Sequence, residues 1–178
     1  MTPEKTDFDF QPTLQGDRVT VRPMTTTDWD DMFAAAADPR IWEQHPASDR
    51  YTKPAFRQYF DGAIGSGSAF AFIDRQSGGI IGSSRYHGHD PVKSEIEVGW
   101  TFLARDYWGG SYNAEIKQLM LEHAFKFVDT VVFWIGEENL RSRKAMEKIG
   151  GVLRDEIQFR DFSGDMPYVV YEMRRNGR

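Results

Sequence analysis

The chain has 178 residues, of which 40% are hydrophobic and 28% are charged, and its formal net charge at pH 7 is −5. This size and composition predict one globular domain, and the negative charge argues against a general nucleic-acid-binding surface. The absence of cysteine excludes disulfides, thiolate metal sites and a cysteine nucleophile, and it fits a reducing cytoplasm. The chain also lacks a membrane-length apolar run and a signal-peptide pattern. A cytoplasmic protein without nucleic-acid or membrane partners is therefore expected.

The beginning of the chain is polar, acidic and contains proline. This composition predicts a flexible tail over residues 1–13, followed by a single domain over residues 14–178.

The pattern of apolar residues predicts an alternation of strands and helices. Apolar residues three and four positions apart indicate helices, and short apolar runs bounded by Gly, Pro or Asp indicate strands. We expect an α+β domain with a mostly antiparallel mixed central sheet and helices on both faces. The expected elements are, in order, a strand at 19–23, a helix at 25–36, a helical piece at 41–42, a helix at 52–64, strands at 69–73, 80–86 and 95–103, a helix at 114–128, a strand at 130–135, a helix from Asn139, and strands at 152–160 and 168–173.

The loop at 105–115 connects a strand to a helix and is rich in small residues. The first N–H groups of a helix have no internal partner and favour an anion. Gly109, Gly110 and Ser111 would let a phosphate approach the backbone closely. A glycine pair before a helix is also common in tight turns, so this loop is weak evidence by itself.

A second motif, Asn-x-x-Ser, opens the helix that follows the next strand. Together the two motifs resemble those of the GNAT N-acetyltransferases, in particular the ribosomal-protein-acetyltransferase-like (RimJ/RimL) branch, over roughly residues 14–173. The matching residues are Tyr107, Trp108, Gly109, Tyr112 and Glu115 in the first motif and Asn139, Ser142, Lys148 and Gly150 in the second.

The resemblance implies an acetyl-CoA-dependent N-acetyltransferase without a metal. Acetyl would pass directly to a primary amine in a ternary complex, and the amine could belong to a protein N-terminus, an amino acid or peptide, or a small molecule. Many members of the superfamily have a catalytic Tyr where this chain has Met146. A catalytically silent acyl-CoA-binding regulatory module is therefore the alternative. The oligomeric state stays open, with a homodimer as one option.

Glu95 and Glu97 are the candidate catalytic bases. They alternate with apolar residues in the strand that precedes the loop, so both carboxylates should share one face. Glu97 is preferred because it is closer to the loop. A solvated strand face would explain the same alternation.

The resemblance implies that Asn139 contacts the pantetheine amide and that Ser142 lies near the sulfur, as a catalytic residue. Helix capping alone would explain Asn139 but not the Ser three residues later. Arg143 lies in a cationic run that could meet the cofactor phosphates or simply face solvent. The residues expected at the cofactor are Phe102, Leu103, Trp108, Gly109, Gly110, Ser111, Tyr112, Asn113, Asn139, Ser142 and Arg143.

The sequence His87-Gly88-His89-Asp90 has a spacing that could bind Zn²⁺ or Ni²⁺. No nearby His or Cys completes such a site, so a polar strand end is the better explanation and no metal site is predicted. His87 fits better as part of the acceptor pocket.

Overall fold

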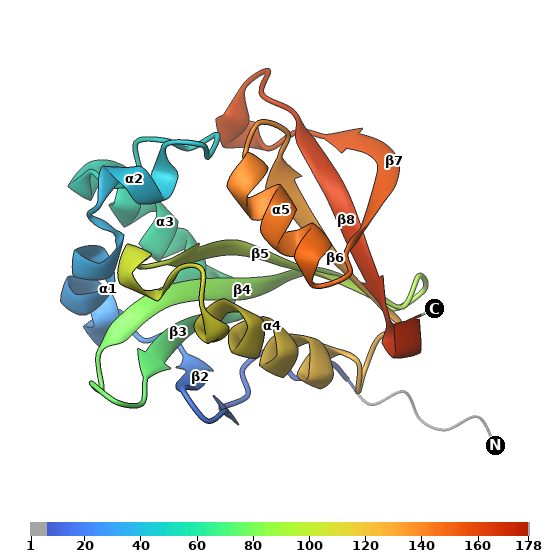
Figure 1. Cartoon of the computed structure of the whole chain (residues 1–178), viewed down its shortest axis with the longest axis horizontal. Helices are drawn as coiled ribbons and strands as arrows, with labels where there is room; N and C mark the ends of the chain where they lie inside the picture. The colour runs from blue at the N-terminus through green and yellow to red at the C-terminus, as the bar shows by residue number, and fades with distance from the viewer. Residues whose placement is uncertain (1–6, 178) are drawn as a thin grey trace.

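The computed structural model of the chain describes residues 7–177, and its centre is one eight-stranded sheet (Figure 1). The strand order is β1-β2-β3-β4-β5-β6-β8-β7. Neighbouring strands are antiparallel except for β5 and β6, which run parallel. The strands are β1 (Leu14–Gln15), β2 (Val19–Pro23), β3 (Ala69–Asp74), β4 (Ile80–Asp90), β5 (Glu95–Leu103), β6 (Thr130–Gly136), β7 (Val152–Gln158) and β8 (Tyr168–Arg174).

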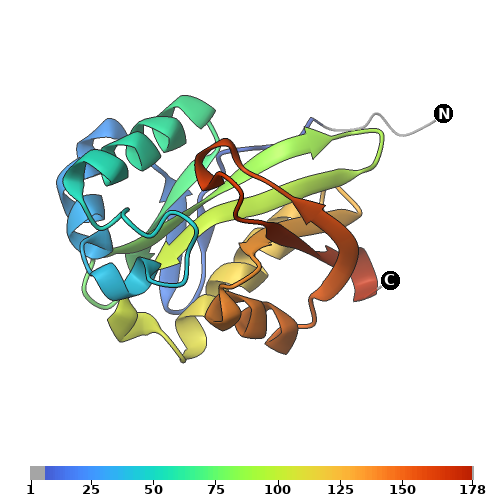
Figure 2. The same cartoon turned by 90° about the horizontal axis from the view of Figure 1, so that it is seen from above.

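Five α-helices of the described chain cover the two faces of this sheet. They are α1 (Trp29–Ala36), α2 (Pro39–Trp42), α3 (Lys53–Ser66), α4 (Ser111–Ala124) and α5 (Leu140–Lys148). Figure 2 shows α1 and α3 on one side of the sheet and α4 and α5 on the other. The predicted α+β class, with a mostly antiparallel sheet covered on both faces, is therefore confirmed.

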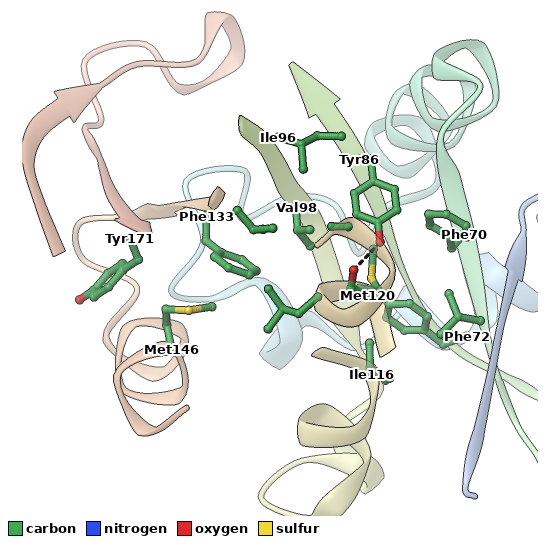
Figure 3. Packing of buried hydrophobic residues seen from close by; sticks show 14 of the residues in the cluster. Phe70, Phe72, Tyr86, Ile96, Val98, Ile116, Met120, Phe133, Met146 and Tyr171 are labelled. Atoms are coloured by element: carbon green, nitrogen blue, oxygen red, sulfur yellow. Dashed lines mark hydrogen bonds between the residues drawn. The ribbon is translucent and has the colours of Figure 1, made fainter. Parts of the chain in front are cut away.

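Two apolar cores hold these layers together. One fills the space between the sheet and helices α4 and α5, where Phe70, Phe72 and Ile96 meet Ile116 and Met120 (Figure 3). The other packs α1, α2 and α3 against the opposite face. Burial of these side chains from water is the main source of stability.

The hydroxyl of Tyr86 ties β4 to helix α4 inside the first core. It donates to the carbonyl oxygen of Met120 at 2.6 Å, which satisfies a polar group that is otherwise buried (Figure 3).

Helix α4 begins three residues earlier than the sequence pattern predicts. Gly110 is extended and serves as the N-cap, so Ser111 is the first helical residue. The helix ends at Ala124, not at residue 128, and the following residues form turns that bond back to its last carbonyl groups. The helix start therefore lies directly at the glycine pair.

The carboxylate of Glu115 on α4 fixes the turn between β1 and β2. It accepts hydrogen bonds from the backbone N–H groups of Asp17, Arg18 and Val19 at 2.8–3.2 Å. A side chain at Gly16 would collide with this carboxylate. The motif residue Glu115 thus has a structural task away from the glycine loop.

The predicted flexible tail needs a correction at its end. Residues 1–6 lie outside the described part of the chain, but Phe8 is buried against Tyr86, His123 and Phe127. His123 also hydrogen-bonds the carbonyl oxygen of Asp9 at 2.8 Å. The described chain therefore packs onto the domain from Phe8, whose buried ring also contacts the ring of Phe10.

The parallel strands β5 and β6 pair at one end only. Their register contains three pairs, of which Glu97 with Val132 is the last, although the strands continue to Leu103 and Gly136. A bulge in β5 accompanies this separation, because β4 residues 83 and 85 pair with β5 residues 102 and 99. Trp100, in the bulge, has a left-handed φ of 53°. The two strands therefore leave unpaired edges facing one another.

In the described part of the chain, no helix has the length and apolar character that crossing a bilayer requires.

Candidate active site

A cavity of about 230 Å³ lies where β5 and β6 separate. Its walls come from both strands, the start of α4, helix α5 and helix α2. Of the residues expected at the cofactor, the cavity wall contains Phe102, Leu103, Trp108, Gly109, Asn113, Asn139 and Ser142. Gly110, Ser111, Tyr112 and Arg143 are not part of the wall.

The glycine loop presents free backbone donors at one end of this cavity. Gly109 has a φ of 69°, which side-chain-bearing residues rarely adopt. Side chains added at Gly109 or Gly110 would meet no atom within 4 Å, so the space beside the loop is open. No side chain caps helix α4, whose first N–H groups are therefore available to an anion.

Two tyrosines of the loop motif hold the loop to strand β3. The hydroxyl groups of Tyr107 and Tyr112 donate to the two carboxylate oxygens of Asp74, at 3.0 and 2.9 Å. Trp108 is held in turn by its indole N–H, which donates to the carbonyl oxygen of Leu103 at 2.7 Å. Tyr112 therefore anchors the loop and leaves the cavity wall to its neighbours.

Asn139 and Ser142 lie together at the start of α5. Asn139 is buried, and its side-chain oxygen accepts from the backbone N–H of Ser142 at 3.4 Å, as an N-cap does. Both residues line the cavity. Capping and contact with a ligand are thus compatible here, because the helix start is itself part of the wall.

Arg141, and not Arg143, is the α5 arginine at the cavity. Arg143 donates to the hydroxyl of Tyr171 at 3.1 Å and to the carbonyl oxygen of Glu137 at 2.8 Å, outside the wall. Arg141 lines the cavity, with its guanidinium carbon 3.9 Å from the centre of the Trp108 ring. Residues two positions apart in a helix face different ways, so Arg143 lies outside the cavity wall while Arg141 is part of it.

Glu97 lies at the point where β5 and β6 separate, and 3% of it is exposed. It forms an ion pair with Arg160. Its carboxylate reaches over the backbone of Gly99, where a side chain would collide with it, and Gly99 lines the cavity. Burial raises the pKa of Glu97 to about 7, although Arg160 and Arg85 act in the opposite direction.

Glu95 shares this strand face, but the structure places it away from the cavity. It forms an ion pair with Arg154, which also donates to Glu172 at 2.6 Å. Glu95 is the first residue of β5, whereas the first β5 residue in the cavity wall is Val98. The paired part of β5 and β6 therefore separates Glu95 from the cavity. Glu95, a candidate base in the sequence analysis, therefore pairs with Arg154 and lies outside the cavity wall.

His45 and Lys117 line the cavity although no sequence motif singles them out. The Nδ1 atom of His45 accepts a hydrogen bond from the N–H of Ala47 at 2.9 Å, and burial lowers the pKa of this imidazole to about 3. The Nζ atom of Lys117 lies 3.5 Å from the Thr101 hydroxyl, and burial lowers the pKa of Lys117 to about 8. Both side chains come from segments whose place at the cavity depends on the tertiary fold.

The histidines near the end of β4 take part in aromatic packing. The His87 ring lies 5.0 Å from the Trp100 ring, and the His89 ring lies 5.4 Å from Phe8. Between residues 7 and 177, no three or more His, Cys, Asp or Glu side chains gather closely enough to hold a metal ion.

Comparison with known proteins gives one family and several related folds. The model of the acetyltransferase (GNAT) domain matches residues 18–152. A GCN5-related N-acetyltransferase from Brucella melitensis superposes with a TM-score of 0.82 at 21% identity, over 96% of this chain and 80% of that one. An acetyltransferase from Agrobacterium tumefaciens gives a TM-score of 0.70 at 23% identity, over 97% and 99%. No curated protein matches.

A third solved structure is named as a candidate ribosomal-protein-serine acetyltransferase from Vibrio cholerae. It gives a TM-score of 0.75 at 13% identity and covers 98% of this chain and 100% of that one. At these identities the three solved structures establish a shared fold.

Proposed function

Because the chain belongs to the acetyltransferase (GNAT) family, whose members use acetyl-CoA as acyl donor, we propose that it transfers acetyl directly to a primary amine in a ternary complex. The observation that supports this most strongly is the shape of the cavity. Its wall includes Gly109 and Asn113 at the start of α4, the unpaired parts of β5 and β6, and Gly99, over whose backbone the buried carboxylate of Glu97 reaches. One end suits phosphates and the other offers a proton acceptor.

The groups that line the cavity are of the chemical types that the successive parts of the acyl donor require. The backbone at Gly109 and the start of α4 would hold its phosphates, with Arg141 as a neighbouring cation. The unpaired edges beyond Glu97 and Val132 offer N–H and C=O groups to its amide-bearing arm. When bound, the donor supplies an activated thioester, and the chain supplies position and charge.

Glu97 is the group that we assign to proton removal from the acceptor amine. A pKa of about 7 lets this carboxylate take a proton near neutral pH, directly or through water. The carboxylate reaches over the backbone of Gly99, a residue of the cavity wall, because Gly99 has no side chain to occupy that space. His45 is a poor alternative, since its Nδ1 atom already accepts a hydrogen bond and its other ring nitrogen must carry the proton.

Ser142 is the group that we assign to the leaving thiolate. Its side chain lies on the wall next to Asn139 and Met146, and a thioether cannot donate a hydrogen bond. A hydroxyl that donates to developing negative charge stabilises the transition state more than the ground state. We place this residue at the sulfur for that reason.

The narrower predictions from the sequence belong with this proposal. These are the RimJ/RimL-like branch and the range of amine acceptors. A cytoplasmic location and a homodimer also stay predictions, and sedimentation velocity on the purified chain would test the homodimer.

The proposed function is tested by release of free thiol from acetyl-CoA in the presence of a mixed panel of amines. Amine-dependent thiol release that is lost in Glu97→Gln is the expected result. Calorimetric binding of acetyl-CoA with thiol release no faster than buffer hydrolysis would instead identify the silent acyl-CoA-binding module. Absence of both binding and release would contradict both readings.

A further inference from the structure

Three arginine side chains gather beside the cavity. Arg50 lies in the loop after α2, Arg85 lies on β4, and Arg160 follows β7. Arg50 and Arg85 are 7% and 8% exposed. Arg50 and Arg85 both lie over the Tyr59 ring, and Arg85 and Arg160 both lie over the Trp100 ring, so the three groups are close neighbours. Burial and the charges of Arg50 and Arg160 lower the pKa of Arg85, while Tyr59 and Glu97 act in the opposite direction. We call these three residues the arginine cluster.

Aromatic rings lie against all three guanidinium groups, and the guanidinium carbon of Arg50 lies 5.1 Å from the centre of the Tyr59 ring. The guanidinium carbon of Arg85 lies 4.2 Å from the centre of the Trp100 ring. That of Arg160 lies 4.3 Å from the same ring and 4.1 Å from the Trp134 ring. Stacking on a ring uses the flat face of a guanidinium group and leaves its N–H edge for hydrogen bonds. The cluster is therefore arranged with donors at its edges.

The negative charge beside the cluster does not balance it. Glu97 forms an ion pair with Arg160 and its charge also acts on Arg85, and the charge of Asp49 acts on Arg50, so two carboxylates face three guanidinium groups. Within residues 7–177, Arg85 has no carboxylate within ion-pair distance, and its Nε atom is buried without a hydrogen-bond partner. Leaving a buried charged donor unsatisfied is costly, and an incoming anion would remove that cost.

The position of Arg85 connects the cluster to the proposed acceptor end of the cavity. Arg85 pairs across the sheet with Gly99, so its side chain shares a face with Glu97. Gly99 and Trp100 both line the cavity. On the other side the guanidinium lies against α3, which has Gly62 there and no side chain in the way.

We propose that the arginine cluster binds an oxyanion on the acceptor, so that the substrate class is an amine that also carries a carboxylate or phosphate group. This inference rests on the proposed acetyl transfer and adds the charge of the acceptor to it. The forked donors of arginine match the two oxygens of a carboxylate or phosphate. With the anion at Arg85, the amine lies on the Glu97 side, where its proton can leave.

The test uses pairs of amines that differ only in the anionic group. The pairs are β-alanine and β-alaninamide, the peptide amides Ala-Glu and Ala-Gln, and O-phosphoethanolamine and ethanolamine, which separate a free carboxylate, an acidic peptide and a phosphate. Binding to the protein saturated with CoA is measured by calorimetry, and turnover is measured by thiol release. The proteins are wild type, Arg85→Gln and Arg85→Lys.

Arg57→Gln is the matched control. Arg57 also stacks on a tryptophan, 4.6 Å from the ring centre of Trp29, and pairs with Asp61, but it is exposed on α3. The control therefore removes the same charge and the same kind of ring contact away from the cavity.

In wild type and Arg57→Gln, the anionic member of at least one pair should bind and react roughly 10- to 100-fold better than its neutral partner, the scale of a charge-assisted hydrogen bond. In Arg85→Gln this preference should fall to about threefold or less, and Arg85→Lys should restore part of it.

Equal use of neutral and anionic amines by wild type would overturn the inference while leaving acetyl transfer intact. An anionic preference in binding without thiol release would support the cluster and refute the proposed transfer. Absence of binding for all pairs, or an equal loss of preference in Arg57→Gln, would also overturn the inference. The wild-type comparison decides the matter even if Arg85→Gln does not fold.

Discussion

Replacing Lys117 with Met should stabilise the folded protein at neutral pH. Lys117 lies on α4 with its ammonium among cavity residues, and burial lowers its pKa from 10.5 to about 8. That difference corresponds to about 3 kcal/mol at ~1.4 kcal/mol per pH unit. The Nζ atom of Lys117 lies 3.5 Å from the hydroxyl of Thr101 and 5.0 Å from the centre of the Phe133 ring. Both of these described contacts are weak. Met fills a similar volume without a charge.

The expected gain in unfolding free energy is about 1–3 kcal/mol at pH 7, because the lost cation–π contact offsets roughly 1 kcal/mol. For a domain of this size, this corresponds to a rise in Tm of about 2–10 °C. The gain should be complete below about pH 8 and should disappear as pH rises toward 10.5, where the lysine of the unfolded chain also loses its proton. As pH rises, the unfolding free energy of the wild type therefore increases through this lysine, whereas that of the variant does not.

Urea unfolding of wild type and Lys117→Met at several pH values measures this difference directly. Lys144→Met is the control, since Lys144 is an exposed lysine within helix α5. A stability difference that is independent of pH, or a Lys117→Met protein that is less stable than wild type at pH 7, would refute the reasoning. A more stable variant with weaker acetyl-CoA binding would indicate that the buried ammonium is retained for the ligand.

Three further predictions concern the proposed transfer. Glu97→Gln should lower kcat/KM by roughly 100-fold or more, and the deficit should shrink as pH rises and free amine becomes available, whereas the wild-type rate should rise through about pH 7. Full activity of this variant from about pH 6 to 9, which brackets the pKa of an α-amine, would rule Glu97 out as base. Ser142→Ala should lower kcat about 10- to 100-fold with little change in acetyl-CoA affinity; a large rise in Kd at unchanged kcat would assign Ser142 to binding or capping. Gly109→Asp should weaken acetyl-CoA binding by at least 1–3 kcal/mol in calorimetry, and Gly65→Asp, on the open surface of α3, should leave it unchanged. Equal affinities in the two aspartate variants would contradict phosphate binding at the loop.

The parts of the site that could be predicted from the sequence are those set by local chemistry. The free helix start at Gly109–Ser111 and the cap at Asn139 depend on neighbouring residues, so their motifs carry the information. The helical spacing of the motif residues could also have favoured Arg141 over Arg143. The cavity wall includes residues 141, 142, 145 and 146 of α5 and Ile149 directly after it, which is a helical spacing that contains Arg141 and excludes Arg143.

The rest of the site depends on contacts between distant segments. Glu97 and Arg160 are 63 residues apart in the chain, and no local pattern links them. His45 reaches the cavity from the loop after α2, which has no periodicity of its own. The alternation of Glu95 and Glu97 predicts their shared face, but the point where β5 leaves β6 decides that Glu97, and not Glu95, adjoins Val98 and Gly99 of the cavity wall.

That separation point explains why the chemistry is concentrated in one place. A parallel pair that stayed in register would use the facing edges of β5 and β6 for its own hydrogen bonds and leave no room between them. The bulge at Trp100 bends β5 away, and the same residue, held in a left-handed conformation, contributes its ring to the stack with Arg85 and Arg160. Strain in the backbone at one residue therefore accompanies both the open edge that we propose for the acyl donor and the charged end that we propose for the acceptor. Replacing Trp100 by Gly would relieve the strain but remove the stack, so we expect it to impair acceptor use more than acetyl-CoA binding; an equal loss of both would show that the bulge serves the fold alone.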